Sequence, residues 1–369
     1  MKSTARYPEI KIQRLRASAY RIPTDFPESD GTIEWKATTL VLVEATAADH
    51  IGIGYTYADG ATAKLINDML AEVVTGHDAM ATSANWLAMI RAIRNLGRPG
   101  IASMAIAAVD SAMWDLKARI LGLPLVTLLG AARGSVAVYG SGGFTSYDNE
   151  QLRNQLSEWA QQGIPRIKMK VGREPHRDVE RVAAARDAIG PKVELFVDAN
   201  GAYTRKQALA LADRFQELGV SWFEEPVSSD DLEGLHFLRD RVPGGMEIAA
   251  GEYGYDLPYF ERMLASESVD VLQADATRCA GITGFIQVAA LCETRSMPLS
   301  AHCGPSLHAH PCCAARPVRH IEYFHDHVRI EHMLFDGVLT PCEGLLKPDL
   351  SRPGMGLEFK QSDAKKYEI

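Results

Sequence analysis

The stretch Phe196-Val197-Asp198-Ala199-Asn200-Gly201 decides how this chain is interpreted. An apolar run ends there at Asp198, and similar apolar runs end at Glu224 and at Glu252. The steps from 198 to 224 and from 224 to 252 are 26 and 28 residues, about the length of one strand followed by one helix. Nearly equal steps of this kind gather the three carboxylates at one mouth of a parallel barrel. Carboxylates so close together repel one another unless a cation lies among them.

The same spacing continues on both sides of these acids. Strand-like segments alternate with helical ones from residue 136 to residue 323, and alternation over about 200 residues is typical of a β/α barrel. Further strands are expected at 136–139, 167–171, 269–275, 297–302 and 320–323. Helices are expected at 149–162, 177–189 and 204–218.

The first 130 residues lack this alternation. The segment 22–31 is rich in Pro, Asp and Gly and predicts an irregular loop. Strands are expected at 38–44 and 51–57, and helices at 62–96 and 102–121. This part is therefore predicted to be an α+β unit. The tail from about residue 340 is rich in Pro and Gly and is expected to fold back onto it.

Composition excludes several classes of protein. The formal net charge of −8 argues against a nucleic-acid-binding protein, because such proteins carry a basic patch. No apolar run of about 18 residues predicts a membrane span, and the N-terminal residues lack the apolar core of an export signal. The six cysteines show no CxxC spacing and are expected to be buried free thiols. We expect a cytoplasmic protein that binds neither nucleic acid nor membrane.

The three acids Asp198, Glu224 and Glu252 offer only oxygen ligands, which suit a hard divalent cation. We expect one Mg²⁺ ion per subunit, with Mn²⁺ as the second choice. The alternative is that each acid is a solvated strand end or a helix cap, but that interpretation leaves their common spacing unexplained.

Two lysines precede the acids on one expected strand. Lys168 and Lys170 are two residues apart and therefore share a face of the strand. Two neighbouring ammonium groups lower each other's pKa, and a nearby cation lowers both further. A neutral lysine is a usable general base. The alternative is a pair of lysines at the barrel rim.

A third group combines Asp275 with His302, which lie at the ends of consecutive expected strands. Asp275 could bond one imidazole nitrogen and fix the tautomer, which leaves the other nitrogen free for proton transfer. Glu322 ends the following strand. It could donate a hydrogen bond to a ligand oxygen if protonated, or it could cap the barrel.

With these elements in order, the chain resembles the enolase superfamily, mandelate racemase subgroup. The resemblance is carried by the K-x-K of Lys168 and Lys170, the VDAN around Asp198, the WFEEP around Glu224, the GE of Glu252, the Asp275/His302 pair and Glu322. It implies a modified (β/α)7β barrel with an α+β capping domain built from both ends of the chain. The expected division is 1–130 for the N-terminal cap, 131–340 for the barrel and 341–369 for the segment that returns to the cap.

The resemblance also implies roles. Lys170 matches the base that removes the proton α to a substrate carboxylate, with Lys168 lowering its pKa, and His302 matches the acid/base on the opposite face. Glu322 matches the donor to the carboxylate, and Asn200 and Ser141 match positions that contact substrate. Glu225 is assigned a structural role.

The capping loop supplies the remaining expected contacts. Trp35 and Tyr57 are expected to bind the far end of the substrate. They stand among polar residues that suit hydroxyl groups, namely Arg21, Asp25, Glu28, Asp30 and Asp59.

The favoured function is Mg²⁺-dependent dehydration of an acid sugar to a 2-keto-3-deoxy acid. Racemisation or epimerisation of a 2-hydroxy acid and lactone cycloisomerisation are the alternatives, and a non-catalytic acid-sugar-binding relative is a remote one. His308-Ala309-His310 raises a zinc-dependent hydrolase, but this H-x-H falls late in the barrel and is expected on a rim helix or loop. The expected partner is a small-molecule carboxylate, and the resemblance implies a homo-oligomer.

Overall fold

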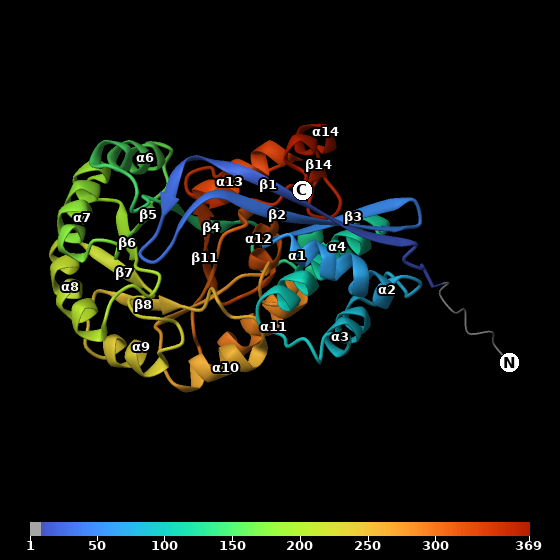
Figure 1. Cartoon of the computed structure of the whole chain (residues 1–369), viewed down its shortest axis with the longest axis horizontal. Coiled ribbons are helices and arrows are strands. Elements are labelled where there is room, and N and C mark those ends of the chain that lie inside the picture. The colour runs from blue at the N-terminus through green and yellow to red at the C-terminus, as the bar shows by residue number, and fades with distance from the viewer. Residues whose placement is uncertain (1–8) are drawn as a thin grey trace.

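A closed ring of parallel strands forms the larger part of the molecule (Figure 1). The computed structural model describes residues 9–369, and within them the neighbours from β4 to β11 run parallel while β11 pairs back onto β4. These eight strands are β4 (Val136–Gly142), β5 (Arg166–Lys170), β6 (Glu194–Asp198), β7 (Val220–Glu224), β8 (Glu247–Ala250), β9 (Val271–Ala274), β10 (Leu299–Ala301) and β11 (Val318–Phe324). The predicted β/α barrel is confirmed.

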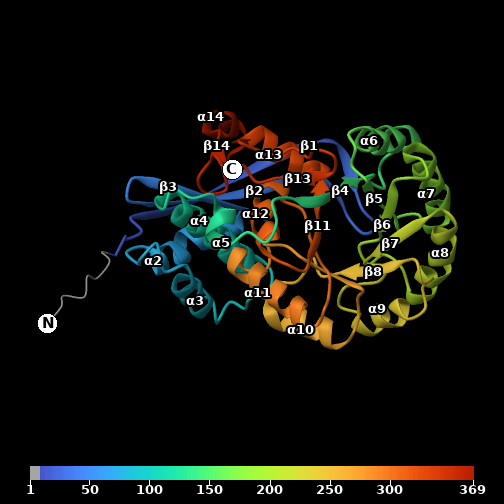
Figure 2. The ribbon, with the colours of Figure 1, turned by 180° about the vertical axis from the view of Figure 1, so that it is seen from behind.

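Helices follow the strands and form an outer arc that is seen from behind in Figure 2. They are α6 (Asn149–Gln161), α7 (Pro175–Ile189), α8 (Arg205–Glu217), α9 (Leu232–Arg239), α10 (Leu257–Ala265), α11 (Gly281–Thr294), α12 (Pro305–Ala314) and α13 (His325–Leu334). Their starts are specified locally. Thr204 and Gln207 form a reciprocal capping box at α8, which satisfies two backbone N–H groups that the helix itself leaves free.

The N-terminal part is a three-stranded antiparallel sheet packed on helices. Its strands are β1 (Arg14–Ser29), β2 (Glu34–Ala47) and β3 (His50–Tyr57). Its helices are α1 (Ala61–Leu65), η1 (Ile66–Leu70), α2 (Ala71–Val74), α3 (Thr82–Ala92), α4 (Ile101–Ile120) and α5 (Leu125–Leu129). On the central strand β2, Val41 and Val43 belong to the core under α4, whereas Leu40 and Leu42 join the core of the barrel. This alternation explains why the whole segment is apolar, since each face of the strand is buried against a different part of the protein.

The expected loop at 22–31 is wrong in part, because β1 continues to Ser29. Pro23 still pairs with Ala37, and the register with β2 shifts between Pro23 and Glu28. Proline is tolerated here because β1 is an edge strand, so its missing N–H removes no hydrogen bond from a central ladder. The prolines therefore produce an irregularity within β1 and do not terminate the strand.

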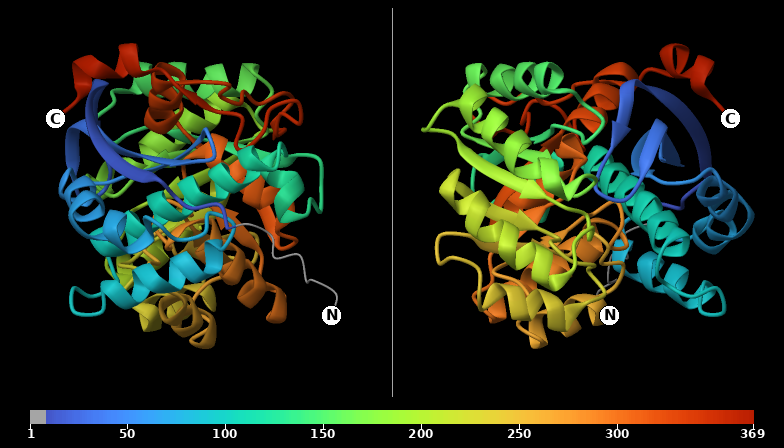
Figure 3. Two further views of the ribbon diagram at one scale, coloured as in Figure 1. Left: turned by 90° about the vertical axis from the view of Figure 1, so that its right-hand side faces the viewer. Right: turned by 60° about the vertical axis from the view of Figure 1, so that its left-hand side comes forward.

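The β1–β2 hairpin reaches over the barrel strands with its tip (Figure 1), and Figure 3 shows the N-terminal sheet beside the barrel from two further sides. The backbone N–H of Thr145, in the segment after β4, donates to the Ser29 carbonyl of the hairpin at 2.8 Å. At the turn, a side chain on Gly31 would lie 2.5 Å from the carbonyl oxygen of Ala199, so only glycine permits this close approach. The hairpin therefore forms one wall above the strand ends.

The tail returns to the N-terminal sheet. Its short elements are β12 (Phe335–Asp336), β13 (Leu345–Leu346), β14 (Glu358–Phe359), α14 (Gln361–Ala364) and η2 (Lys365–Tyr367). The rings of Phe359 and Tyr20 lie 5.3 Å apart, and the N–H of Ile369 donates to the Ala19 carbonyl at 3.0 Å.

Two expectations from composition can be compared with the structure. The six cysteines are free thiols, of which Cys342 is exposed and the other five are buried; the expectation of burial was therefore wrong for Cys342, which lies in the irregular tail. Within residues 9–369, none of the helices combines the length and apolarity needed to cross a membrane.

One buried acid joins the two parts of the fold and yields a pH prediction. Asp110 on α4 accepts hydrogen bonds from the Thr283 N–H (2.8 Å) and hydroxyl (2.7 Å) on α11, and burial raises the pKa of Asp110 to about 7. Because the folded pKa exceeds the unfolded one, this carboxyl favours folding only while protonated, and stability is lost as the pH rises toward 7. Relative to Asp110→Asn, the wild-type free energy of unfolding is expected to fall by about 3 kcal/mol between pH 5 and pH 8.

Urea unfolding at several pH values measures this difference. The exposed Asp213→Asn on α8 is the matched control and should run parallel to the wild type. If the free energy of unfolding of Asp110→Asn also varied with pH in parallel with that of the wild type, Asp110 would be ionised in the folded protein across this range.

Candidate active site

The register of adjacent strands brings the three predicted metal ligands together. Asp198 on β6 pairs in register with Lys170 on β5 and with Glu224 on β7. Glu252 follows β8 after Gly251, whose φ is 134° and where a side chain would meet the Gln273 carbonyl oxygen at 2.2 Å. One carboxylate oxygen from each of Asp198, Glu224 and Glu252 lies within 4.8 Å of the others, and all three residues are buried.

This cluster fits a hard divalent cation. All its donors are carboxylate oxygens, the set that Mg²⁺ prefers. The Oε2 atom of Glu252 is buried and accepts no hydrogen bond from the described residues, although His302 Nε2 lies 3.4 Å away. A buried carboxylate oxygen is rarely left without a partner, so this atom is available to a ligand. Burial and the charge of Asp198 raise the pKa of Glu224 well above its usual range, so a cation beside it would favour its ionised form.

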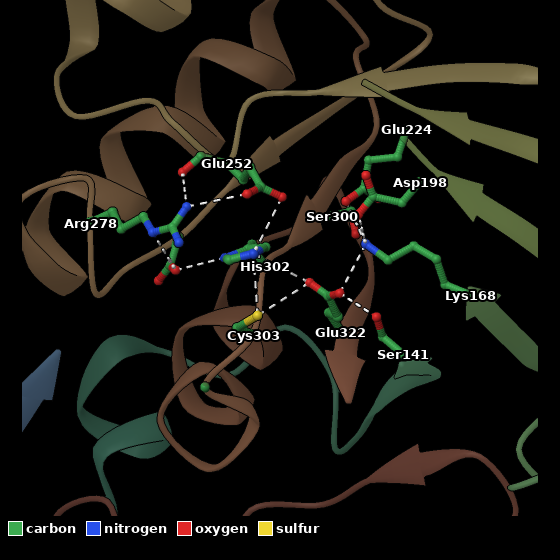
Figure 4. Close-up of polar contacts among 12 residues, drawn as sticks. Ser141, Lys168, Asp198, Glu224, Glu252, Arg278, Ser300, His302, Cys303 and Glu322 are labelled. Atoms are coloured by element: carbon green, nitrogen blue, oxygen red, sulfur yellow. Dashed lines mark hydrogen bonds and ion pairs between the residues drawn. The ribbon is translucent and has the colours of Figure 1, made fainter. Parts of the chain in front are cut away.

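The side chains of Lys168 and Lys170 both point at these acids, as their shared strand face requires (Figure 4 labels Lys168). Lys170 Nζ lies 2.5 Å from Asp198 Oδ2. Lys168 forms ion pairs with Glu224, with Glu322 at 2.9 Å and with Asp198 at 3.2 Å. Lys168 is fully buried, whereas Lys170 lines the cavity described below. Of the two, only Lys170 can reach a substrate.

The expected lowering of the lysine pKa values is not seen among the protein groups alone. Burial and the neighbouring Lys168 lower the pKa of Lys170, but Asp198, Glu252 and Glu322 outweigh them and raise it above its usual range. The same two ammonium groups act in return on Asp198, whose pKa falls to about 2 although burial opposes the change. Two lysines on one strand do not reveal, from their spacing alone, the carboxylates that face them from other strands.

His302 and Asp275 form the expected pair. His302 Nδ1 lies 2.8 Å from Asp275 Oδ2, and Asp275 also accepts the Thr277 N–H at 2.7 Å. Burial would raise the pKa of Asp275, but the hydrogen bond and charge of His302 lower it below its usual range. An ionised Asp275 holds the proton on Nδ1, so that Nε2 is the ring atom left to exchange a proton with a ligand. Nε2 lies 3.2 Å from Cys303 Sγ.

Glu322 is held as an acceptor rather than as the expected donor. Its Oε1 accepts the Ser141 hydroxyl at 2.6 Å and pairs with Lys168 at 2.9 Å. Burial would raise the pKa of Glu322, but Lys168 and His302 lower it well below its usual range. Ser141 is fully buried behind Glu322 and is not among the cavity-lining residues. Ser141 thus contacts Glu322 (Figure 4), and its expected contact with substrate stays a prediction.

An aromatic layer forms the floor below the carboxylates. Phe196 and Trp222 stack with ring centroids 5.1 Å apart, and Tyr139 packs against both. The indole N–H of Trp222 donates to Glu224 Oε2 at 3.0 Å. Lys168 Nζ lies 5.3 Å from the centroid of the Tyr139 ring. These rings exclude water from below and fix the orientation of Glu224 and Lys168.

The backbone bends sharply just after the site residues. Asn200, Glu225 and Cys303 have positive φ values of 46°, 37° and 53°, a conformation that is uncommon for residues other than glycine. Each follows a site residue by one or two positions. Such strained positions cluster at functional sites, and here they turn the chain away from the barrel so that the preceding side chain keeps its direction.

A cavity of about 400 Å³ opens between the strand ends and the hairpin. Three of the residues expected to contact substrate, Asn200, Trp35 and Tyr57, line this cavity. Two acids of the capping loop, Asp30 and Asp59, line it as well. Arg21, Asp25 and Glu28 do not: Glu28 is buried and accepts the Trp35 indole N–H at 2.7 Å, and Asp25 pairs with His325 at 3.0 Å.

Among the lining residues that the sequence interpretation missed are Arg278, Cys303 and His327. Arg278 Nη1 lies 3.2 Å from the Glu252 carbonyl oxygen and 3.4 Å from its Oε1, Cys303 adjoins His302, and the His327 ring stacks on Tyr57 with centroids 3.4 Å apart. Arg278 and Cys303 follow Asp275 and His302 by three residues and one residue, and this proximity in sequence was a usable signal. His327 had no such signal, because its place depends on how α13 docks on β3.

His308 and His310 lie on α12, on a rim helix as expected, and both are fully buried. His308 Nε2 accepts the Ala276 N–H at 2.8 Å, and His310 Nε2 donates to the Met355 carbonyl at 3.0 Å. Neither belongs to a metal-binding cluster among the described residues. They connect α12 to its neighbours and do not form a zinc site.

Family models match both parts of the chain. Residues 21–130 match the N-terminal domain of the mandelate racemase / muconate lactonizing enzyme family, and residues 151–364 match the enolase C-terminal domain-like family. The second match alone spans more than half of the chain. The protein belongs to the enolase superfamily. The resemblance to its mandelate racemase subgroup is confirmed.

Several enolase-superfamily relatives cover almost the whole chain. The 3,6-anhydro-α-L-galactonate cycloisomerase of Streptomyces coelicolor is 32% identical over 359 residues, which span 95% of this chain and 98% of the relative. L-talarate/galactarate dehydratase of Salmonella typhimurium is 30% identical over 364 residues, 95% of this chain and 89% of the relative. Its crystal structure with Mg and L-lyxarohydroxamate superposes with a TM-score of 0.90 at 27% identity and covers 100% of this chain and 95% of that one.

A solved structure of higher identity shares the same architecture. The mandelate racemase/muconate lactonizing enzyme-like protein of Rubrobacter xylanophilus is 57% identical, with a TM-score of 0.95 and coverage of 97% of this chain and 100% of that chain. These relatives include lyases and isomerases of one superfamily.

Proposed function

We propose that this protein removes the proton α to the carboxylate of an acid sugar and dehydrates it to a 2-keto-3-deoxy acid. The proposal is carried by one observation: Lys170 and His302 line a single cavity together with Glu252. A base, an acid and a metal-binding carboxylate are thus available to one ligand. The relatives that dehydrate acid sugars support the reaction class.

Asp198, Glu224 and Glu252 would hold one Mg²⁺ ion. When bound, the ion supplies positive charge that stabilises the enolate. Relatives crystallised with magnesium support this assignment.

The protein groups divide the proton transfers. Lys170 takes the α-proton in its neutral form, which a cation held by the facing acids would favour, and the electron pair of the C–H bond moves into the enolate. His302 gives a proton to the β-hydroxyl, the C–O bond breaks with its electron pair, and water leaves. The resulting enol becomes the 2-keto acid by taking one proton at the β-carbon and releasing that of its hydroxyl. Asp275 acts through His302 by holding its Nδ1 proton, and Ser141 and Lys168 hold Glu322.

The positions of Lys170 and His302 favour proton transfers on two different sides of the ligand. Lys170 extends from β5, and His302 follows β10. Even along the shorter arc of the barrel, two strands, β4 and β11, lie between β5 and β10. A ligand in the cavity is therefore approached from separate directions. The same arrangement supports racemisation when no leaving group is present.

Cycloisomerisation is the second candidate. It is favoured by the cycloisomerase relative, which is 32% identical over nearly the whole length of both chains. The chemistry differs only after the enolate forms, when a ring oxygen rather than a hydroxyl leaves the β-carbon.

A screen of acid sugars and their lactones with Mg²⁺ in deuterated water tests the proposal. A 2-keto acid that has lost one water relative to the substrate supports dehydration, and a ring-opened 2-keto acid of unchanged composition supports cycloisomerisation. Deuterium at the α-carbon without any 2-keto acid supports racemisation or epimerisation. No exchange with any acid sugar that binds would refute the proposal and favour a non-catalytic acid-sugar-binding protein. The symmetric oligomer and the cytoplasmic location expected from the sequence stay predictions.

A further inference from the structure

The cavity has two chemically different ends. Lys170, Glu252 and His302 line the end that holds the proposed chemistry. The N-terminal sheet and α13 line the other end, with Asp30, Trp35, Thr38, Thr39, Tyr57 and His327. Asp59 stands exposed at the entrance on the same side. This far wall must recognise the part of the substrate that does not react.

The far wall suits hydroxyl groups. The Tyr57 hydroxyl donates to the His327 carbonyl at 3.3 Å, so its oxygen can still accept a hydrogen bond. The Nδ1 atom of His327 is buried and has no hydrogen-bond partner among the described residues. Since a buried polar atom without a partner is costly, a hydroxyl of the ligand is a fitting partner for it.

The same wall does not suit a second carboxylate. The basic side chains that line the cavity within residues 9–369 are Lys170, Arg278, His302 and His327. Lys170 is paired with Asp198 and His302 with Asp275. Burial and the charge of His302 lower the pKa of His327 well below its usual range, so this imidazole is neutral near pH 7.

Arg278 belongs to the reactive end and is already engaged. Its guanidinium lies 3.4 Å from Glu252 Oε1 and 3.7 Å from Asp275 Oδ2, and it packs over the Tyr253 ring at 5.2 Å. Beside the far wall, Arg329 on α13 pairs with Asp326 at 2.6 Å and donates to the Pro23 carbonyl at 2.8 Å. Arg329 does not line the cavity.

The carboxylates of the far wall add repulsion. Asp30 Oδ1 accepts the Thr32 and Ile33 N–H groups at 2.6 and 2.8 Å, and Asp59 Oδ1 accepts the Ala61 N–H at 2.9 Å. Both acids are fixed by these turns and cannot move away from a ligand without losing them. A second carboxylate on the ligand would face like charges and no free cation among the lining residues described.

We propose that this cavity selects acid sugars with one carboxylate, the aldonic acids and their deoxy or anhydro derivatives, over the aldaric acids, which carry a carboxylate at both ends. The proposal rests on the proposed function for the reactive end and adds the class of substrate.

Matched pairs of ligands test it. D-gluconate with D-glucarate and D-galactonate with galactarate share their hydroxyl configuration and differ only in oxidation at the far carbon. Binding is measured by calorimetry with Mg²⁺, and α-proton exchange is measured separately in deuterated water. The better-binding aldonate is expected to bind at least about tenfold more tightly than its aldarate, because like charges at short range repel even when partly screened.

Three variants locate the selectivity. Asp30→Asn and Asp59→Asn keep the acceptor oxygen of each turn and remove the charge, so each is expected to lower the aldonate-to-aldarate ratio about threefold to tenfold. The control is Asp349→Asn: Asp349 accepts the Ser351 N–H and hydroxyl at 2.9 and 2.7 Å in a similar turn, but it does not line the cavity. This control should leave the ratio unchanged.

The two readouts separate the two proposals. Selective binding of an aldonate without exchange would support the substrate class and refute the proposed reaction. Equal or tighter binding of the aldarates would overturn the substrate class whether or not exchange occurs. If no member of either series binds, the class is overturned as well.

Discussion

Glu252→Gln is expected to weaken Mg²⁺ binding by on the order of 100-fold and to reduce turnover by on the order of a thousandfold or more. The substitution keeps the size of the side chain but removes one of three negative charges. It also places an amide where the buried Oε2 now has no hydrogen-bond partner among the described residues. Calorimetric titration with Mg²⁺ measures the first effect, and the acid-sugar assay measures the second.

Glu247→Gln is the matched control, because Glu247 begins the same strand β8 at the opposite end of the barrel. There it pairs with Arg319 at 2.7 Å, so its loss should leave both measurements near the wild-type values. If Glu252→Gln bound Mg²⁺ as tightly as the wild type, Glu252 would have to be removed from the ligand set.

His302→Asn is expected to slow dehydration by about 10²- to 10⁴-fold, the usual contribution of a general acid, while deuterium exchange at the α-carbon continues through Lys170. Asparagine can still donate to Asp275 but cannot transfer a proton to the leaving hydroxyl. Lys170→Ala should lose both exchange and dehydration, because the α-proton must be removed before the hydroxyl can leave. NMR of the substrate in deuterated water separates the two steps.

The control for this pair is His332→Asn on the exposed side of α13, which should change neither step. Full turnover by His302→Asn would refute its role as the acid. If His302→Asn lost both deuterium exchange and dehydration while Lys170→Ala kept deuterium exchange, the roles of the two residues would have to be swapped.

The clustering of the three acids was predictable because strand ends in a barrel obey a simple spacing rule. Asp198 and Glu224 are in register on neighbouring strands, and that relation follows from the length of one strand–helix unit. The pairing of Asp275 with His302 follows from the same rule. Here the sequence alone was sufficient to predict which side chains meet.

The remaining features depend on contacts between distant segments. His327 enters the cavity because α13 docks against β3, and its stacking on Tyr57 has no local signal. The hairpin strand β1 passes through Pro23 because it lies at an edge, which local propensity does not reveal. The charges around Lys170 were misjudged for a related reason, since the carboxylates that face it come from other strands.

The carboxylates of the site outnumber its ammonium groups, and this has a consequence for the order of binding. Asp198, Glu224, Glu252 and Glu322 surround Lys168 and Lys170, so the protein alone presents excess negative charge to an anionic substrate. A divalent cation offsets that excess, and cation and anion therefore bind with positive cooperativity. By thermodynamic linkage each must raise the affinity of the other by the same factor. Substrate therefore binds tightly only when the metal is bound. The metal affinity measured without substrate is correspondingly lower than the metal affinity of the substrate complex.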